Sequence, residues 1–285
     1  MYDYRSLSFV SYEEIYETFK NAFSDYVVPF SKSFDELIYM IERRGFNADI
    51  SFGAFYNNEL VGFTLNGIGS WEGKLTAYDT GTGVLKEHRK KGIAKQIFLE
   101  SLPVLRNNNI EQYLLEVIDS NKPAVDLYKK MGFQETRRLN FQVIDKNNLS
   151  LKQCDSSVKI MEVENISWNE AKVFWNDKPS WQNSIESIER KRDSFSFVTA
   201  KKSGNIIGYG IIQKSNGDIP QLAVKRENRK TNIASALLNY MKDLTDSENF
   251  RFINTIQNDD ETNRFFEKIG VQKEGSQLEM IKILD

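Results

Sequence analysis

The chain has only one cysteine, Cys154, and one histidine, His88, among its 285 residues. A single cysteine excludes an internal disulfide, and a single histidine leaves no ligand cluster with the spacing of a zinc site. A Ser-His-Asp triad is also disfavoured, because His88 lies inside a run of basic residues. We therefore predict no metal site and no disulfide framework.

Proline and long apolar runs are also scarce. Five prolines and 16 glycines leave little room for low-complexity linkers, and 40% hydrophobic with 27% charged residues is typical of globular proteins. No stretch approaches the roughly 18 apolar residues that a membrane helix needs, and the first residues lack the pattern of a secretory signal. We expect a cytoplasmic protein with no membrane partner.

The sequence also lacks a large excess of positive or negative charge. The 38 basic and 40 acidic side chains give a net charge of -2, which supplies no general attraction for nucleic acid. The one dense basic run, from Lys86 to Lys95, has no interleaved aromatic residues that could stack on bases. We therefore predict no nucleic-acid partner.

The length exceeds that of one ordinary hydrophobic core, so two domains are expected. Hydrophobic periodicity predicts the order ααβββαβαβ in the first half and a similar order in the second. In the first half, helices are expected at 11–25, 33–44, 92–107 and 123–131, and strands at 50–56, 60–67, 74–85, 112–118 and 139–144. In the second, helices are expected at 168–175, 185–192, 233–244 and 260–269, and strands at 158–163, 195–201, 206–213, 219–224, 250–254 and 278–283.

The two halves also match each other at a nearly constant offset. Gly132 and Gly270 are 138 residues apart, as are Tyr128 and Phe266. Such self-similarity indicates an internal duplication. We place the join near residue 150, after a polar turn, which gives domains of residues 1–150 and 151–285.

The most informative segment runs from Val84 to Lys95, where a strand end is followed by a basic, glycine-containing entry into a helix. A helix N-terminus presents unpaired N–H groups and a partial positive charge, and Gly92 would let an anion approach closely. The segment lacks the G-x-x-x-x-G-K-[ST] of a P-loop, and Gly81-Thr82-Gly83 lacks the rest of a dinucleotide fingerprint. A different kind of pyrophosphate site is indicated.

The run Arg89-Lys90-Lys91-Gly92-Ile93-Ala94 resembles the [QR]-x-x-G-x-[GA] loop of the GCN5-related N-acetyltransferase (GNAT) superfamily. A second block, Leu115-Glu116-Val117 followed by Asn121 to Phe133, is similar to that family's next motif in order and spacing. The resemblance implies an α/β (mixed α+β) fold of two tandem GNAT-like domains, each a twisted mixed central sheet flanked by helices. It also implies acetyl-CoA as co-substrate, held where strands 74–85 and 112–118 splay apart.

The resemblance further implies roles for particular residues. Tyr128 would donate a proton to the departing CoA sulfur, and a carboxylate would accept the proton of the amine. Strand parity leaves Glu116 and Asp79 as alternatives for this base, and we rank Glu116 first; Gly81 and Gly83 would mark a bulge or the close approach of a ligand. The cofactor contacts carried over are Val84, Leu85, Arg89, Lys90, Lys91, Gly92, Ile93, Ala94, Lys95, Asn121, Ala124 and Tyr128.

The second half departs from the motif at the positions that matter most. Asn232 stands where the first half has Gly92, and Phe265-Phe266 replace the Leu-Tyr pair that contains Tyr128. We therefore interpret this half as a degenerate copy with a structural or substrate-shaping role, and assign Phe174, Trp175 and Trp181 no functional role.

The resulting hypothesis is acetyl transfer from acetyl-CoA to an amine of a small molecule or peptide. One alternative is a non-catalytic acyl-CoA-binding module or sensor. Another is an enzyme of the same fold that uses a longer acyl donor or an acceptor on a protein, RNA or antibiotic. A homodimer is left open, as is the role of the aromatic segment from Asp25 to Phe30, which could pack between helices or line the substrate site.

Overall fold

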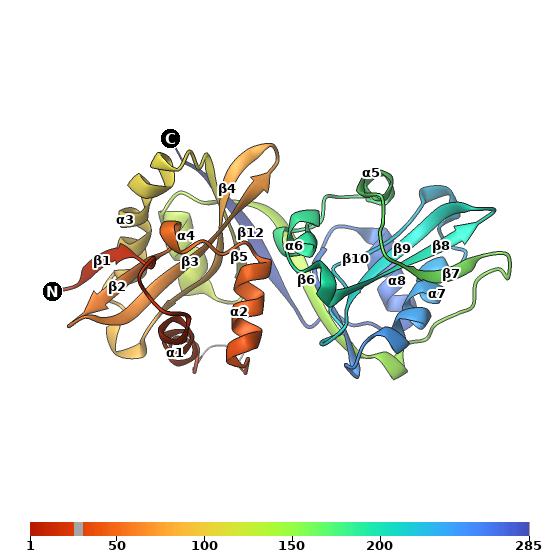
Figure 1. Ribbon diagram of the computed structural model, residues 1–285, viewed down its shortest axis with the longest axis horizontal. Helices are drawn as coiled ribbons and strands as arrows, with labels where there is room; N and C mark the ends of the chain where they lie inside the picture. Colours follow the sequence, from red (N-terminus) through yellow and green to blue (C-terminus); the bar gives the residue numbers. More distant parts are fainter. Residues whose placement is uncertain (26–30, 285) are drawn as a thin grey trace. The chain divides into compact units, whose positions relative to one another are not determined.

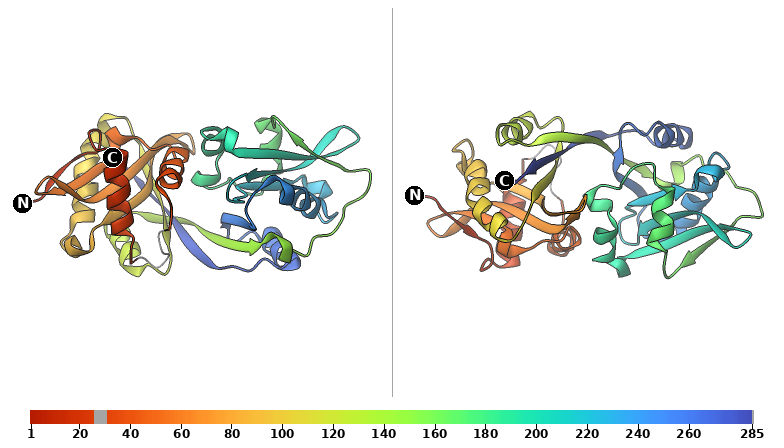
Figure 2. Two further views of the ribbon diagram at one scale, coloured as in Figure 1. Left: turned by 60° about the horizontal axis from the view of Figure 1, so that its bottom comes forward. Right: turned by 90° about the horizontal axis from the view of Figure 1, so that it is seen from above.

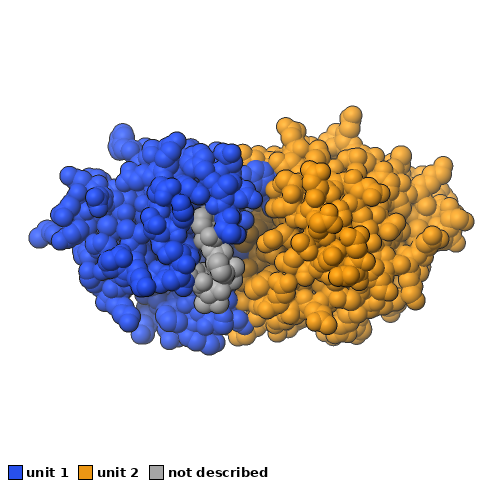
Figure 3. Space-filling model, turned by 90° about the horizontal axis from the view of Figure 1, so that it is seen from below, with its two compact units in different colours: residues 1–136, 278–285 blue, residues 137–277 orange. Residues whose placement is uncertain are grey.

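The computed structural model describes residues 1–25 and 31–284. The chain forms two compact units, unit 1 with residues 1–136 and 278–285 and unit 2 with residues 137–277 (Figure 3). All of the aromatic segment after Asp25, whose role the sequence left open, lies outside the described residues. Residue 150 remains our predicted join between the two sequence repeats.

Unit 1 contains a mixed sheet with the strand order β1-β2-β3-β4-β5, followed by the part of β12 that belongs to this unit (Figure 1). Neighbouring strands from β1 to β4 are antiparallel, and β4 and β5 are parallel. The strands are β1 (Asp3–Ser6), β2 (Phe52–Tyr56), β3 (Glu59–Trp71), β4 (Lys74–Val84), β5 (Gln112–Ile118) and β12 (Gly275–Ile283). The helices are α1 (Tyr12–Ala22), α2 (Phe34–Arg43), α3 (Ile93–Asn107) and α4 (Lys122–Lys130).

Helices cover both faces of this sheet (Figure 2). On one face, α1 and α2 bury Ile15, Phe19 and Leu37 in a cluster with side chains of β3. On the other, Ile93 and Ile97 of α3 pack with β2 and β3. Both α1 and α2 begin at a serine whose side chain accepts from the backbone N–H three residues on, as is typical of helix N-termini.

Two irregularities interrupt the regular pairing of β4 with its neighbours. The register between β3 and β4 shifts so that Leu65 faces Gly81 while Asn66 faces Asp79, which leaves Thr80 as a bulge. The parallel pairing of β4 with β5 extends from Thr76 only as far as Tyr78. The predicted bulge and the predicted splaying of these two strands are therefore both present.

The glycines of β4 serve the packing of α1. A Cβ atom on Gly81 would lie 2.8 Å from the ring of Phe19, and one on Gly83 would lie 2.8 Å from the ring of Phe63. Of the two alternatives that these glycines indicated, the bulge is present, and the groups that approach the glycines closely are the protein's own aromatic side chains.

Unit 2 contains a four-stranded antiparallel sheet in the order β10-β9-β8-β7 and a separate antiparallel pair of β6 with β11. Its strands are β6 (Gln134–Asp145, of which residues 137–145 lie in this unit), β7 (Lys159–Val163), β8 (Phe195–Lys202), β9 (Asn205–Gln213), β10 (Gln221–Val224) and β11 (Asn249–Ile256). Its helices are α5 (Trp168–Ala171), α6 (Ile185–Glu189), α7 (Ile233–Met241) and α8 (Asp260–Ile269). Across residues 1–25 and 31–284, none of the helices is long and apolar enough to cross a membrane.

The last strands of the two repeats have changed places. Strand β6 ends the first repeat, yet its residues from Arg137 onward pair with β11 in unit 2. Strand β12 ends the second repeat, yet Leu278 and Met280 are buried in the core of unit 1 with Val125 and Phe133. Hydrophobic patterning could not reveal this exchange, because the spacing of apolar residues predicts a strand and does not say which other strand it pairs with.

Candidate active site

The loop before α3 has the geometry of an anion site. Gly92 is the N-cap of α3 with φ 78° and ψ 7°, and Lys90 also has a positive φ of 60°. A Cβ atom on Gly92 would meet no atom within 4 Å, so this side of the loop is open. The first turn of a helix leaves its N–H groups without acceptors inside the helix, and the loop is therefore suited to a pyrophosphate.

The side chains of the loop divide into two kinds. Arg89 is fixed by the protein itself, because Nε donates to the Val84 carbonyl at 3.0 Å and Nη2 donates to the Ala22 carbonyl at 2.8 Å. Both terminal nitrogens also donate to Asp25, and these bonds hold the pKa of the Asp25 carboxyl below its usual range. The exposed side chains of Lys90, Lys91 and Lys95 supply the positive charge around the opening.

Several other residues predicted to contact the cofactor pack in the core or cap a helix. Ile93 is buried against the sheet, and Val84 and Leu85 pack beside the same cluster at the end of β4. Asn121 caps α4, where its side chain accepts from the N–H of Ala124 at 3.3 Å. The cap fixes the start of the helix that carries Tyr128.

Tyr128 meets Asp79 in the gap between β4 and β5. Its hydroxyl donates to Asp79 Oδ2 at 3.2 Å, and Thr82 Oγ1 donates to the same oxygen at 2.8 Å. The N–H of Gly81 donates to the other carboxylate oxygen at 2.9 Å. Burial raises the pKa of the Asp79 carboxyl to about 6, because these bonds only partly offset the loss of water. Asp79, Tyr128 and Ala94 line one small cavity of about 10 Å³.

Glu116 lies on the other face of the sheet. Leu115 and Val117 are buried in the core beside α3 and α4, so the alternation of strand β5 turns Glu116 away from them. Its Oε2 accepts a hydrogen bond from the Tyr78 hydroxyl at 3.0 Å. The structure thus brings Tyr128 together with Asp79, the carboxylate that we ranked second, and places Glu116 apart from both.

His88 lies away from this gap. Its Nδ1 is 2.9 Å from the hydroxyl of Tyr2, and its ring packs near Tyr56. These contacts are those of a structural residue beside the loop.

Unit 2 retains the loop conformation in spite of its altered sequence. Asn232 is the N-cap of α7 with φ 63° and ψ 15°, and Lys230 has φ 63°, close to the values at Gly92 and Lys90. Asparagine adopts this left-handed region more readily than most side chains do. Arg229 repeats two bonds of Arg89, donating through Nε to the Val224 carbonyl and through Nη2 to the Phe174 carbonyl, each at 3.0 Å.

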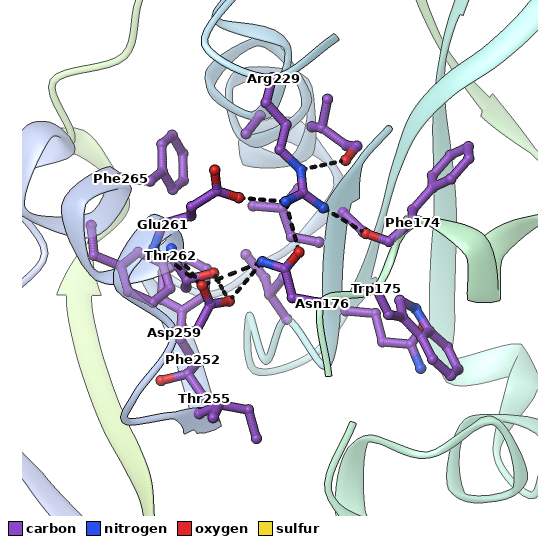
Figure 4. Close-up of a pocket in the computed structure, with 18 of the residues that line it drawn as sticks. Phe174, Trp175, Asn176, Arg229, Phe252, Thr255, Asp259, Glu261, Thr262 and Phe265 are labelled. Atoms are coloured by element: carbon purple, nitrogen blue, oxygen red, sulfur yellow. Dashed lines mark hydrogen bonds and ion pairs between the residues drawn. The ribbon is translucent and has the colours of Figure 1, made fainter. Parts of the chain in front are cut away.

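Unit 2 also holds a cavity of about 430 Å³, which the sequence did not predict (Figure 4). Phe174 and Trp175, to which we assigned no functional role, both line it. Aromatic residues at such spacing belong to hydrophobic cores far more often than to ligand sites, so no feature of the pattern distinguished them.

The sequence profile of the Acetyltransferase (GNAT) family matches the chain twice, over residues 12–133 and over residues 160–271. The two matched regions lie on either side of residue 150 and together cover most of the chain.

Curated relatives match shorter stretches. An N-alpha-acetyltransferase from Sulfurisphaera tokodaii is 38% identical over 63 residues, which are 22% of this chain and 38% of that protein. The streptothricin acetyltransferase of Streptomyces lavendulae is 31% identical over 77 residues, which are 27% of this chain and 40% of that protein. The chain thus spans well under half the length of these two relatives.

Solved structures match over the whole chain. A tandem GNAT protein from the clavulanic acid biosynthesis pathway has a TM-score of 0.72 at 12% identity, covering 100% of this chain and 99% of that one. A putative acetyltransferase from Pyrococcus horikoshii has a TM-score of 0.69 at 18% identity, covering 99% and 89%. At such low identity these structures show the fold, and the predicted tandem arrangement is confirmed.

Proposed function

The chain belongs to the acetyltransferase (GNAT) family, and we propose that it transfers an acetyl group from acetyl-CoA to an amine, with the reaction taking place in unit 1. The main support for this proposal is that the loop before α3 and the Tyr128–Asp79 pair lie close together in that unit. The anion loop leads into α3, and Ala94 of that helix lines the same small cavity as Tyr128 and Asp79. A site for phosphate and a site for proton transfer therefore meet where β4 and β5 separate.

The residues present fit acetyl-CoA. The open face of the loop at Gly92, with the surrounding lysines, suits the pyrophosphate, and the unpaired ends of β4 and β5 suit an extended arm. The bound thioester supplies the acyl group. Transfer forms a C–N bond to the amine, breaks the C–S bond, and leaves one proton to be removed from nitrogen and one to be added to sulfur.

We assign these two proton transfers to different residues. The Tyr128 phenol is the group that we assign to protonate sulfur, because it lies in the gap between β4 and β5; its O–H, which donates to Asp79 here, would turn to the sulfur as the C–S bond breaks. Asp79 is the positioning residue that holds this phenol. Glu116 remains our proposed base, because Asp79 already accepts hydrogen bonds from three donors, the N–H of Gly81 and the hydroxyls of Thr82 and Tyr128.

The acceptor is proposed only as a class. The names of the curated relatives include both N-alpha-acetyltransferases and an acetyltransferase for streptothricin, so a peptide α-amine and a small-molecule amine are both candidates. The cytoplasmic location expected from the sequence stays a prediction, and a homodimer stays a possibility that the sequence left open.

The test is calorimetric titration of the full chain with acetyl-CoA, comparing wild type with Gly92→Glu and Asn232→Glu. Each variant places a carboxylate in one of the two loops, and the loops share one backbone conformation, so each serves as control for the other. We expect one binding event that only Gly92→Glu abolishes. Absence of any binding would refute the acyltransferase proposal, and a second event would show that unit 2 also binds acetyl-CoA.

Catalysis is then tested by amine-dependent release of free thiol, using a panel of short peptides and small amines. Binding without thiol release for every amine would favour a non-catalytic acyl-CoA-binding module or sensor.

A further inference from the structure

The hydroxyl of Thr82 reaches the Asp79 carboxylate because of the bulge at Thr80. In a regular strand, residues three apart point to opposite faces of the sheet. The register between β3 and β4 shifts by one residue at Thr80, and the extra residue brings Asp79 and Thr82 to the same face. Thr82 Oγ1 donates to Asp79 Oδ2 at 2.8 Å, the same oxygen that accepts from the Tyr128 phenol.

The same hydroxyl has a second acceptor within reach. Thr64 lies opposite Thr82 in the register of β3 and β4, is 4% exposed, and has its Oγ1 3.0 Å from Thr82 Oγ1. A threonine hydroxyl has one proton to donate, and an ionised carboxylate is the stronger acceptor. Thr82 therefore donates to Asp79 while the carboxylate is ionised. When Asp79 is protonated, Thr82 can accept from its O–H and donate to Thr64 instead.

The other titratable and charged groups that face Asp79 come from three elements. The Tyr113 hydroxyl of β5 donates to Asn66 Oδ1. Arg44, at the end of α2, donates through Nη1 to the carbonyl of the bulged residue at 3.0 Å, and its charge acts on Asp79 through space. Tyr128 of α4 donates to Asp79 directly. The residues of α3 that line the same small cavity are apolar.

The bond from Thr82 favours the ionised form of Asp79. Burial raises the pKa of this carboxyl to about 6, and the hydrogen bond from Thr82 is the strongest of the influences that lower it. A hydrogen bond donated to a carboxylate stabilises the charged form. Without the Thr82 hydroxyl, Asp79 would take up a proton at higher pH and would no longer be the carboxylate that accepts from Tyr128.

Unit 2 has no such pair of hydroxyls at the corresponding positions. Thr82 lies two residues before Val84, whose carbonyl accepts from the arginine of the anion loop, and the corresponding carbonyl in unit 2 belongs to Val224. Two residues before Val224 lies Leu222, which is paired with Gly210. The two hydroxyls are thus present in the unit that has the phenol and absent from the unit that has a phenylalanine in its place.

We propose that Thr82 is a positioning residue for the reaction in unit 1, whose hydroxyl keeps the Asp79 carboxylate ionised and turned toward Tyr128. Thr64 is the alternative acceptor that takes the Thr82 proton when Asp79 is protonated. The proposal rests on the acetyl transfer proposed for unit 1, because it concerns how the proton donor of that reaction is held.

The test compares Thr82→Val, which removes the hydroxyl and keeps the branched shape, with Thr82→Ser, which keeps the hydroxyl. The full chain is assayed by amine-dependent thiol release between pH 5 and pH 9. We expect Thr82→Val to move the acid-side inflection of kcat up by about one pH unit, as fits the loss of one hydrogen bond to a charged group. At pH 6.5 its kcat should fall about threefold, since fewer molecules then hold Asp79 ionised. The Kd for acetyl-CoA should stay the same, and Thr82→Ser should restore the wild-type profile.

Thr64→Val makes the same chemical change in the other member of the pair. It removes the acceptor that Thr82 needs when Asp79 is protonated, so the inflection should move to lower pH. The ionisation of Asp79 is also followed directly by carbon-13 NMR of its carboxyl, with Asp79→Asn to assign the signal. This readout does not depend on turnover.

Thr82→Ala, which also lacks the hydroxyl, should give the same shift as Thr82→Val and replaces it if thermal melting shows that the valine variant does not fold. An unchanged inflection without the Thr82 hydroxyl, or a shift to higher pH in Thr64→Val as well, would overturn the proposal and leave acetyl transfer by unit 1 intact. Wild type that releases no thiol with any amine would instead refute the acetyl transfer, and the role of Thr82 with it.

Discussion

At the scale of single residues, the hydrogen bond from Tyr128 to Asp79 links the two groups to which we assign the proton donor and its positioning in unit 1. The phenol donates to the Asp79 carboxylate, and burial raises the pKa of this carboxyl to about 6. Two measurements separate the roles of these residues.

Replacing Tyr128 with Phe removes the proposed proton donor and retains the ring that packs against Phe133. We expect kcat to fall by about 100-fold or more, the usual contribution of a general acid, while the Kd for acetyl-CoA stays the same. Steady-state rates and calorimetry measure the two quantities. Unchanged kcat would assign Tyr128 a packing role only.

The ionisation of Asp79 should make kcat depend on pH on the acid side of the profile. Its pKa of about 6 means that the carboxylate, the form that accepts from Tyr128, is lost as pH falls through 6. We expect kcat to decline below pH 6 with the loss of one ionised group, and Asp79→Asn to remove that inflection. A profile with the same inflection in the variant would assign it to another residue.

The same shift predicts a change in stability. Because the folded pKa is raised from 3.8 to about 6, the folded state binds the extra proton between these values, and the free energy of unfolding falls as pH rises through this window. Relative to Asp79→Asn, wild type should lose up to about 3 kcal/mol between pH 4 and pH 7. Urea unfolding at the two pH values measures this difference, and the lost hydrogen bonds of the variant cancel from it.

At the scale of elements, the packing of α1 on β4 depends on the absence of a side chain at Gly81. An alanine there would place its Cβ 2.8 Å from the ring of Phe19. We expect Gly81→Ala to lower the free energy of unfolding by about 1–3 kcal/mol through overpacking. The double variant with Phe19→Leu should recover part of the loss, and a double-mutant cycle without coupling would contradict this account.

At the scale of the whole molecule, the core of unit 1 includes residues from the far end of the chain. Met280 is fully buried in unit 1, and Met241 is fully buried in unit 2. Each change to Ala should cost about 2–5 kcal/mol. We expect Met280→Ala to weaken protection from hydrogen exchange in β4 and β5, and Met241→Ala to do so in β8 and β9. The opposite pattern would contradict the strand exchange.

Much of the fold could be predicted because its signals are local. The helix at α3 follows from apolar periodicity and Gly92, and the bulge in β4 was indicated by Gly81 and Gly83. Strand β1 and the helical turns near Trp181 were missed, because four-residue strands and single turns are too short to show a period.

Part of the candidate site could also be predicted, namely the part that lies in contiguous motifs. The loop at Gly92 and the Tyr128 block were recognisable as contiguous motifs. Which carboxylate meets Tyr128 was not, because that depends on strand parity, on the bulge at Thr80 and on the angle at which α4 crosses the sheet.

The sequence by itself determined the duplication, the order of most elements, the family and the residues of the anion loop, since each is written in consecutive or regularly spaced positions. Only the tertiary structure decided that β6 and β12 exchange units, that Asp79 lies beside Tyr128, and that unit 2 encloses a cavity next to Asn183. These features depend on contacts between residues far apart in the chain, where many pairings satisfy the same hydrophobic pattern and packing selects one of them.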